Sequence, residues 1–219
     1  MSFNIPAAKP EAIQLNDEFD FYQLLSPDGL ISICGYASLL SERSARTTFP
    51  YLINYRVAKL PGFRRVFAAV APIFFERGIA NLETKIPAFI KREHEFRFLA
   101  VLPESLDGKP FTNSAVLCAR SNDEELFHRK CKGNKDIFFQ NYERHNIDSF
   151  WPDDILPCRV YLRHCVLAAK NLGDEAYNNF LDHTFLGDRK TTIREYLAMT
   201  GAGIMEEEPP ESLKTRYGG

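Results

Sequence analysis

The sequence lacks the glycine-rich loops that hold nucleotide phosphates: neither Gly-x-x-x-x-Gly-Lys nor Gly-x-Gly-x-x-Gly occurs in its 219 residues. It also lacks Cys-x-x-Cys pairs, and its densest group of metal-ligand types, His164 and Cys165 with His183, has no recognised ligand spacing. The five cysteines are odd in number, which leaves one unpaired in any disulfide scheme and favours a reducing compartment. We therefore expect no metal and no cofactor.

Neither sign of charge dominates the chain. The 27 Lys and Arg are offset by 29 Asp and Glu, for a net charge of −2, so a nucleic-acid partner is not expected. The longest apolar stretch, 66–75, contains Pro72 and falls short of the ~20 residues that span a bilayer, so no membrane partner is expected. The first residues resemble neither a signal peptide nor a transit peptide, and the simplest expectation is a cytoplasmic protein.

Apolar residues, by contrast, are plentiful. They make up 45% of the chain and include 18 Phe and 9 Tyr, enough for one hydrophobic core at this length. No Gly/Ser-rich or Pro-rich linker divides the chain. We predict an N-terminal extension over 1–28, a single domain over 29–200 and a C-terminal tail over 201–219, with the acidic, Pro-rich part from Glu206 extended over the surface or mobile.

Hydrophobic patterns divide the chain into a first half rich in strands and a second half rich in helices. Strands are predicted over 30–36, 52–60, 63–70, 95–102 and 115–119, with a tight turn at Pro61-Gly62 and a helix over 81–94. Asn122 is the predicted N-cap of a helix through Arg129, and further helices begin at Asp136 and cover 158–172, 174–186 and 191–199. This order indicates an α+β fold with a small, curled, mostly antiparallel sheet.

The apolar strand over 30–36 ends in small residues that suit a ligand-binding turn. Backbone N–H groups in a turn after a strand can form a concave nest for an anion, and Gly35 and Ala37 let a small carboxylate approach closely. Cys34 lies inside the apolar strand, where it packs rather than attacks. Ser38 lacks the Gly-x-Ser-x-Gly context of a serine nucleophile, which leaves it as a hydrogen-bond donor. Such a nest binds a ligand but performs no chemistry.

Chemistry would then fall to a carboxylate at the end of the predicted helix over 81–94. Glu93 lies beside apolar Phe89, and partial burial would raise its pKa toward the working range of a general acid/base. The alternative is that Glu93 is a surface carboxylate paired with a cation such as Arg92. Glu95 is the rival carboxylate, and it falls inside the predicted strand, whose alternation turns it to the opposite face.

Four segments within residues 30–173 resemble, in order, segments of the γ-glutamylcyclotransferase-like superfamily. The first, Tyr36-Ala37-Ser38-Leu39, resembles the Tyr-Gly-Ser-Leu signature of that family. The second, 61–67, resembles the strand that follows the signature. The third, Ile90-Lys91-Arg92-Glu93, resembles the helix end that bears the catalytic glutamate, and the fourth, 157–173, resembles a later helix of the family.

The resemblance implies an α+β fold and a γ-glutamyl substrate. Tyr36, Ala37, Ser38 and Leu39 would hold the α-carboxylate of the substrate, and Glu93 would be the general acid/base. The substrate's own α-amine would attack its γ-carbonyl, which gives 5-oxoproline and a free amine without a protein nucleophile. Tyr161 would line the pocket, although an ordinary helix-packing aromatic is an equal interpretation.

Two features depart from the family pattern. Ala37 replaces the signature glycine, which is tolerable at negative φ but clashes in a left-handed conformation. The helices predicted over 174–199 exceed the minimal family domain, and their open roles are to cap the pocket, form a homodimer face or complete the core. A second hypothesis is a non-catalytic module that keeps this fold and binds a small carboxylate or a protein partner, because a Glu93 paired with Arg92 would be a poor base.

Overall fold

The described residues separate into two units that alternate along the chain. The computed structural model describes residues 12–69, 86–145, 147–199, 202–211 and 214–217. Unit 1 takes the described residues up to Cys34 together with Ala58–Phe63 and Arg97–Ala119, and unit 2 takes the remainder. The loop over residues 35–39, Glu93 and Tyr161 all belong to unit 2.

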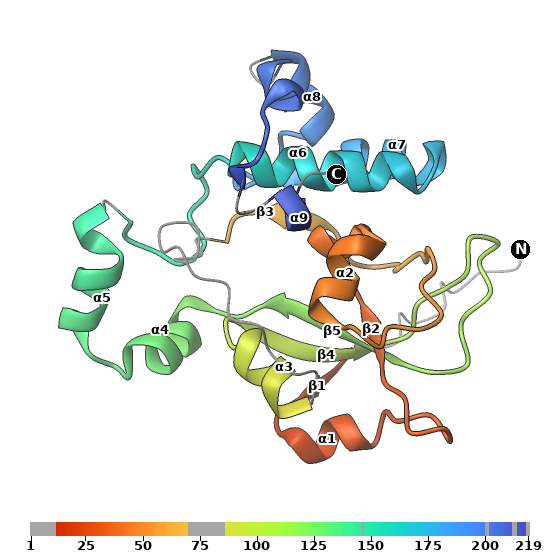
Figure 1. Ribbon diagram of the computed structural model, residues 1–219. Coiled ribbons are helices and arrows are strands. Elements are labelled where there is room, and N and C mark those ends of the chain that lie inside the picture. The colour runs from red at the N-terminus through yellow and green to blue at the C-terminus, as the bar shows by residue number, and fades with distance from the viewer. Residues whose placement is uncertain (1–11, 70–85, 146, 200–201, 212–213, 218–219) are drawn as a thin grey trace, which may run out of the picture. The chain divides into compact units, whose positions relative to one another are not determined.

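Unit 1 contains a four-stranded sheet (Figure 1). Its strands, in spatial order, are β1 (Ile13–Leu15), β4 (Phe96–Val101), β5 (Ala115–Arg120) and β2 (Ser32–Cys34). Helix α1 (Glu18–Tyr22) begins at Asp17, whose carboxylate accepts the backbone N–H of Phe19 at 2.9 Å. The ring of Phe21 on α1 meets Phe98 of β4 edge to face, with centroids 5.2 Å apart, so an aromatic contact joins α1 to the sheet.

The sheet is mixed, which corrects the prediction of a mostly antiparallel one. Strands β1 and β4 are antiparallel, with Ile13 opposite Ala100, whereas β2 and β5 are parallel, with Ser32 opposite Ala115. Parallel neighbours need a crossover of a dozen or more residues, and the long chain between β2 and β5 supplies it. The coarser prediction, an α+β fold, is confirmed.

Helices dominate unit 2, as predicted for the C-terminal half. Its α-helices are α2 (Glu42–Thr48), α3 (Ile86–Arg92), α4 (Asp123–Cys131), α5 (Lys135–Asn141), α6 (Arg159–Asn171), α7 (Asp174–His183), α8 (Ile193–Met199) and α9 (Lys214–Tyr217). Its 3-10 helices are η1 (Ser38–Leu40), η3 (Glu143–His145) and η4 (Ala202–Glu206). Two short strands, β3 (Arg65–Phe67) and β6 (Thr184–Leu186), pair in parallel.

Local sequence signals placed several of these boundaries correctly. Asn122 caps α4, since its side-chain Oδ1 accepts the backbone N–H of Glu125 at 2.7 Å. Gly173 follows α6 with φ at 101°, a conformation that glycine adopts without steric cost. Both terminal signals therefore act as predicted.

Strand partners were predicted less well. The tight turn predicted at Pro61-Gly62 is present, with Gly62 at φ 85°. The segments on either side of it have other partners, because β3 pairs with β6 and Lys59 forms an isolated bridge with Glu104. The helix predicted over 174–186 ends at His183, and its last three residues form β6. Parts of two predicted elements, residue 70 and residues 81–85, lie outside the described residues.

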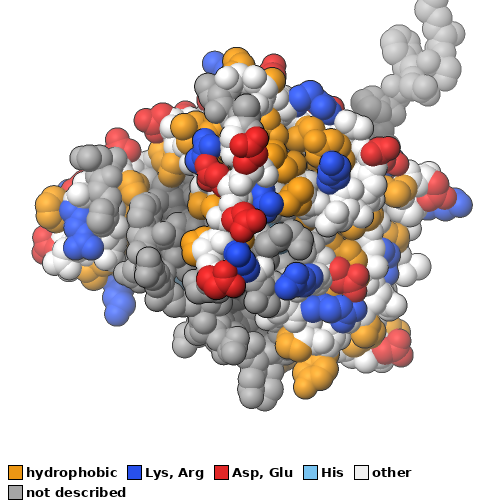
Figure 2. Space-filling view, turned by 45° about the horizontal axis from the view of Figure 1, so that its top comes forward, with side chains coloured by type: hydrophobic (Ala, Val, Ile, Leu, Met, Phe, Trp, Pro, Cys, Tyr) orange, Lys and Arg blue, Asp and Glu red, His pale blue; other side chains and the backbone are white. Residues whose placement is uncertain are grey.

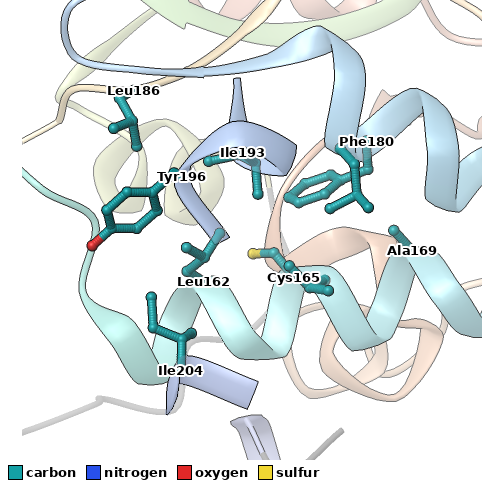
Figure 3. Close-up of a cluster of buried hydrophobic side chains, with 10 residues drawn as sticks. Leu162, Cys165, Ala169, Phe180, Leu186, Ile193, Tyr196 and Ile204 are labelled. Carbon is teal, nitrogen blue, oxygen red and sulfur yellow. The ribbon is translucent and has the colours of Figure 1, made fainter. Parts of the chain in front are cut away.

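The principal core of unit 2 surrounds α6, and we call it the α6 core (Figure 3). Leu162 and Cys165 of α6 point toward Phe180 of α7 and Ile193 of α8. Its buried members are Leu162, Cys165, Val166, Ala169, Phe180, Leu181, Leu186, Ile193, Tyr196 and Ile204. A second cluster, the α4–α5 core, consists of Leu126, Cys131, Tyr142, Phe150 and Trp151.

The C-terminal segment differs from the extended or mobile tail that was predicted. Within the segment from Glu206, α9 contacts α2 and α6, and just before that segment Ile204 of η4 is fully buried in the α6 core. The acidic, Pro-rich composition from Glu206 onward gave no sign of the contacts that α9 makes.

On the face drawn in Figure 2, Lys and Arg side chains are interspersed with Asp and Glu rather than gathered by sign. Within the described part of the chain, no helix is both long enough and apolar enough to cross a membrane.

Candidate functional site

The 35–39 loop turns back tightly on itself directly after β2. A Cβ atom on Gly35 would lie 2.4 Å from the Cβ of Leu39, far inside any normal contact distance, so glycine is required there. The turn continues into η1, in which the Leu40 N–H donates to the Ala37 carbonyl oxygen at 2.9 Å. Tyr36 is partly buried at the start of this turn.

Ala37 fits the loop without a left-handed conformation. Its φ is −129° and its ψ is −111°, so the left-handed conformation in which a Cβ would clash is not used. The Ala37 side chain packs against the α6 core together with Leu40. The methyl group that departs from the family signature is therefore used in packing.

Tyr161 of α6 contacts the loop directly. The backbone N–H of Ser38 donates to the Tyr161 hydroxyl oxygen at 3.3 Å, across 123 residues of sequence. Burial raises the pKa of Tyr161 well above its usual value, so the hydroxyl stays protonated at neutral pH. Its ring packs edge to face on Phe67 of β3, with centroids 6.2 Å apart. The structure thus brings together the loop and the predicted pocket residue of α6.

Cys165 lies one helical turn after Tyr161 and is a poor nucleophile. The thiol is fully buried, and this burial raises its pKa, while a hydrogen bond with Tyr161 acts in the opposite direction. Cys165 therefore packs in the α6 core.

Tyr55 also holds the loop, and sequence reasoning missed it. Its hydroxyl donates to the carbonyl oxygens of Leu40 and Leu39, at 2.5 and 3.2 Å. Burial, followed by the charge of Glu42, raises the pKa of Tyr55 to about 12. Nothing in the local sequence marked Tyr55, because it stands in a segment predicted to be an ordinary strand.

Glu93 lies in the turn between α3 and β4. Its N–H donates to the Phe89 carbonyl oxygen and its own carbonyl oxygen accepts the Phe96 N–H, each at 2.9 Å. The side chain is partly buried. One helical turn earlier, the Phe89 ring lies 5.9 Å from that of Phe49, the residue that ends α2. The contact between Phe89 and Phe49 therefore links α3, one turn before Glu93, with α2, the helix that follows η1.

Glu95, the alternative candidate for the general acid/base, is paired with a lysine. It precedes β4 instead of lying within a strand, and it forms an ion pair with Lys130, whose side chain is only 7% exposed. The same ammonium donates to the Tyr142 hydroxyl at 3.1 Å. This pairing ties Glu95 to the α4–α5 core.

Arg65, in the segment that resembles the family strand, links β3 with α7 and β6. Its guanidinium donates to Thr184 Oγ1 at 2.9 Å and to Asn179 Oδ1 at 2.5 Å. This position gives Arg65 a structural role.

Comparison of the chain with family models, with curated proteins and with solved structures returns no match. Its site must therefore be interpreted from its own residues. Within the described residues, the structure holds no group of three or more His, Cys, Asp or Glu side chains arranged to bind a metal ion. The described arrangement is a tight backbone turn clamped by two tyrosines. Glu93 lies after α3 in the same unit, and the ring contact of Phe89 with Phe49 relates α3 to α2, the helix that follows the loop.

Proposed function

We propose that the chain is a γ-glutamylcyclotransferase-like enzyme that releases 5-oxoproline from a γ-glutamyl amide. The observation that carries this proposal is the clamped 35–39 loop, whose Ser38 amide meets the Tyr161 hydroxyl. A turn of backbone N–H groups that is fixed through the Ser38–Tyr161 contact suits the α-carboxylate of a γ-glutamyl group, which the other amides of the turn would receive. The loop and Tyr161 come from two of the segments that resemble the superfamily.

In the proposed reaction, the α-amine of the substrate attacks the γ-carbonyl carbon. A C–N bond forms to close the five-membered lactam, and the original amide C–N bond breaks. Glu93 takes a proton from the attacking amine and returns it to the departing nitrogen, so the enzyme ends in its starting protonation state. Because the attack is intramolecular, orientation of the substrate supplies much of the rate enhancement.

The assignment of Glu93 rather than Glu95 is supported by their partners. The carboxylate of Glu95 is already held in an ion pair by the ammonium of Lys130, whose side chain is only 7% exposed. Glu93 lies in the turn that follows α3, and the Phe89 ring of α3 contacts Phe49 at the C-terminal end of α2. Between the two carboxylates, Glu93 is the better general acid/base.

The test is an assay of 5-oxoproline release from a panel of γ-glutamyl amino acids, glutathione and γ-glutamyl polyamines. Replacing the general acid/base by Glu93→Gln is expected to lower kcat by about 10²–10⁴-fold. Glu124→Gln, an equal change at an exposed position of α4, is the matched control and is expected to keep full activity. Activity that survives in Glu93→Gln would contradict the role of Glu93. No product across the panel, with retained binding of a γ-glutamyl amide, would favour the binding module.

A further inference from the structure

Tyr55 lies in the irregular segment between α2 and β3, and its hydroxyl reaches the backbone of the 35–39 loop. The oxygen lies 2.5 Å from the Leu40 carbonyl oxygen and 3.2 Å from that of Leu39. One phenolic proton is shared between these two acceptors. Because burial raises the pKa of Tyr55 to about 12, the hydroxyl remains a donor throughout the physiological range.

These carbonyls stand where η1 gives way to α2. The last carbonyl groups of a helix have no partner within the helix and need a donor from outside. The next helix begins at once, since the Ser41 side chain accepts the Ser44 N–H at 3.2 Å as the N-cap of α2. The Tyr55 hydroxyl therefore donates at the junction between two helical turns.

The loop is thus held at two points by hydrogen bonds of opposite sense. Tyr161 accepts the Ser38 N–H, and Tyr55 donates to the carbonyls of Leu39 and Leu40. A carbonyl group and the N–H of the next residue lie in one peptide plane, so fixing the Leu39 and Leu40 carbonyls fixes the N–H groups of Leu40 and Ser41. These donate to the carbonyl oxygens of Ala37 and Ser38, at 2.9 and 3.2 Å, and so hold the peptide groups that carry the Ser38 and Leu39 amides. An anion nest depends on the direction of its amides.

We infer that Tyr55 is a positioning residue, which orients the amides of the 35–39 loop through the backbone of Leu39 and Leu40. Its effect on catalysis rests on the proposed function, whereas its effect on the loop does not. A carboxylate contact of this kind is made equally in the ground state and the transition state. Loss of the hydrogen bonds from the Tyr55 hydroxyl is therefore expected to raise KM while kcat stays nearly constant.

The first measurement is hydrogen exchange of the backbone amides of residues 37–41 in the full chain. Tyr55→Phe removes one hydroxyl and keeps the ring, and we expect exchange in the loop to become about tenfold faster. Tyr51→Phe is the matched control, because Tyr51 is 89% exposed, and it is expected to leave exchange unchanged. Unaltered loop exchange in Tyr55→Phe would overturn the inference.

The second measurement is the kinetics of 5-oxoproline release. In Tyr55→Phe, KM is expected to rise about tenfold with kcat changed less than twofold, and a fall confined to kcat would contradict a positioning role. If the wild-type chain releases no 5-oxoproline, the proposed function fails, while the exchange measurement still decides whether Tyr55 holds the loop. If Tyr55→Phe does not fold, fluorotyrosine at position 55 is the second variant, because it keeps the ring and the hydroxyl. Its hydroxyl is more acidic and stops donating at a lower pH than that of tyrosine. At that pH, the exchange of the loop amides must be faster in this variant than in the wild type.

Discussion

Gly35 and Ala37 stand two residues apart in one loop and face opposite steric demands. The approach of Leu39 leaves no room for a side chain on Gly35, because an added Cβ would lie 2.4 Å from the Leu39 Cβ. Ala37 has a negative φ, and its methyl group packs on the α6 core. The first position therefore depends on glycine and the second benefits from alanine.

Substitutions at these two positions are expected to differ sharply. Gly35→Ala must displace the loop, so we expect a marked loss of γ-glutamyl turnover and a lower melting temperature. Ala37→Gly restores the family signature but removes a packed methyl group, so we expect unchanged turnover and a loss of stability of about 1 kcal/mol. Melting curves and 5-oxoproline assays of both variants check this. A large gain of activity in Ala37→Gly would show that the methyl group obstructs the ligand.

Substitutions of the two neighbouring carboxylates are expected to differ: that of Glu93 should lower mainly activity, and that of Glu95 mainly stability. Glu95→Gln leaves the nearly buried Lys130 ammonium without its counter-charge, which is expected to lower the free energy of unfolding by about 3 kcal/mol. Urea denaturation measures this loss. Glu93→Gln is expected to lose less stability than Glu95→Gln, and an equal loss in both variants would contradict the separation.

Tyr55 is expected to make stability depend on alkaline pH. Its pKa lies near 10 when the side chain is exposed, and burial raises it to about 12 in the folded chain. Between these values the folded state binds more protons than the unfolded state, so the stabilisation, complete below pH 10, is lost as the pH rises toward 12. Melting temperatures of the wild type should fall more steeply over this range than those of Tyr55→Phe. Parallel curves would assign the loss to other groups.

At the scale of elements, helix ends were predictable and strand partners were not. Asn122 and Gly173 act through their nearest neighbours in sequence, so the sequence alone revealed them. The partner of β3 lies about 120 residues away in β6, and an apolar pattern carries no information about so distant a neighbour. For the same reason the 35–39 loop was recognisable, whereas its clamp by Tyr55 required the folded backbone.

Helix α9 provides a test of the C-terminal segment. The Tyr217 ring lies edge to face on Tyr161 and His164 of α6, with centroids 5.6 and 5.2 Å away. Tyr217→Ala removes both contacts and is expected to lower the free energy of unfolding by about 1–2 kcal/mol. Tyr217→Phe keeps the ring and is expected to match the wild type. Denaturation curves that leave Tyr217→Ala unchanged would mean that α9 does not contribute to the stability of unit 2.

At the scale of the whole molecule, neither unit is a continuous piece of chain. Unit 2 draws on residues between and after those of unit 1. The α6 core is built mainly from residues after 160, yet Ala37, Leu40 and Phe67 pack against it from the first third of the chain. Strand β6 likewise takes its partner, β3, from that early part.

A fragment over residues 120–219 is therefore expected not to fold by itself. It would carry α4 to α9 but would expose the side of the α6 core that Ala37, Leu40 and Phe67 cover, and it would leave β6 unpaired. Isolated helices of this length are marginal in water, so the fragment should show weak helical circular dichroism and a broad urea transition. Mixing it with a fragment over residues 1–119 should restore a sharp transition, because the missing strand and loop return. A sharp transition in the 120–219 fragment alone would show that the helices form a self-sufficient core, and that the early segments bring the site to it without stabilising it.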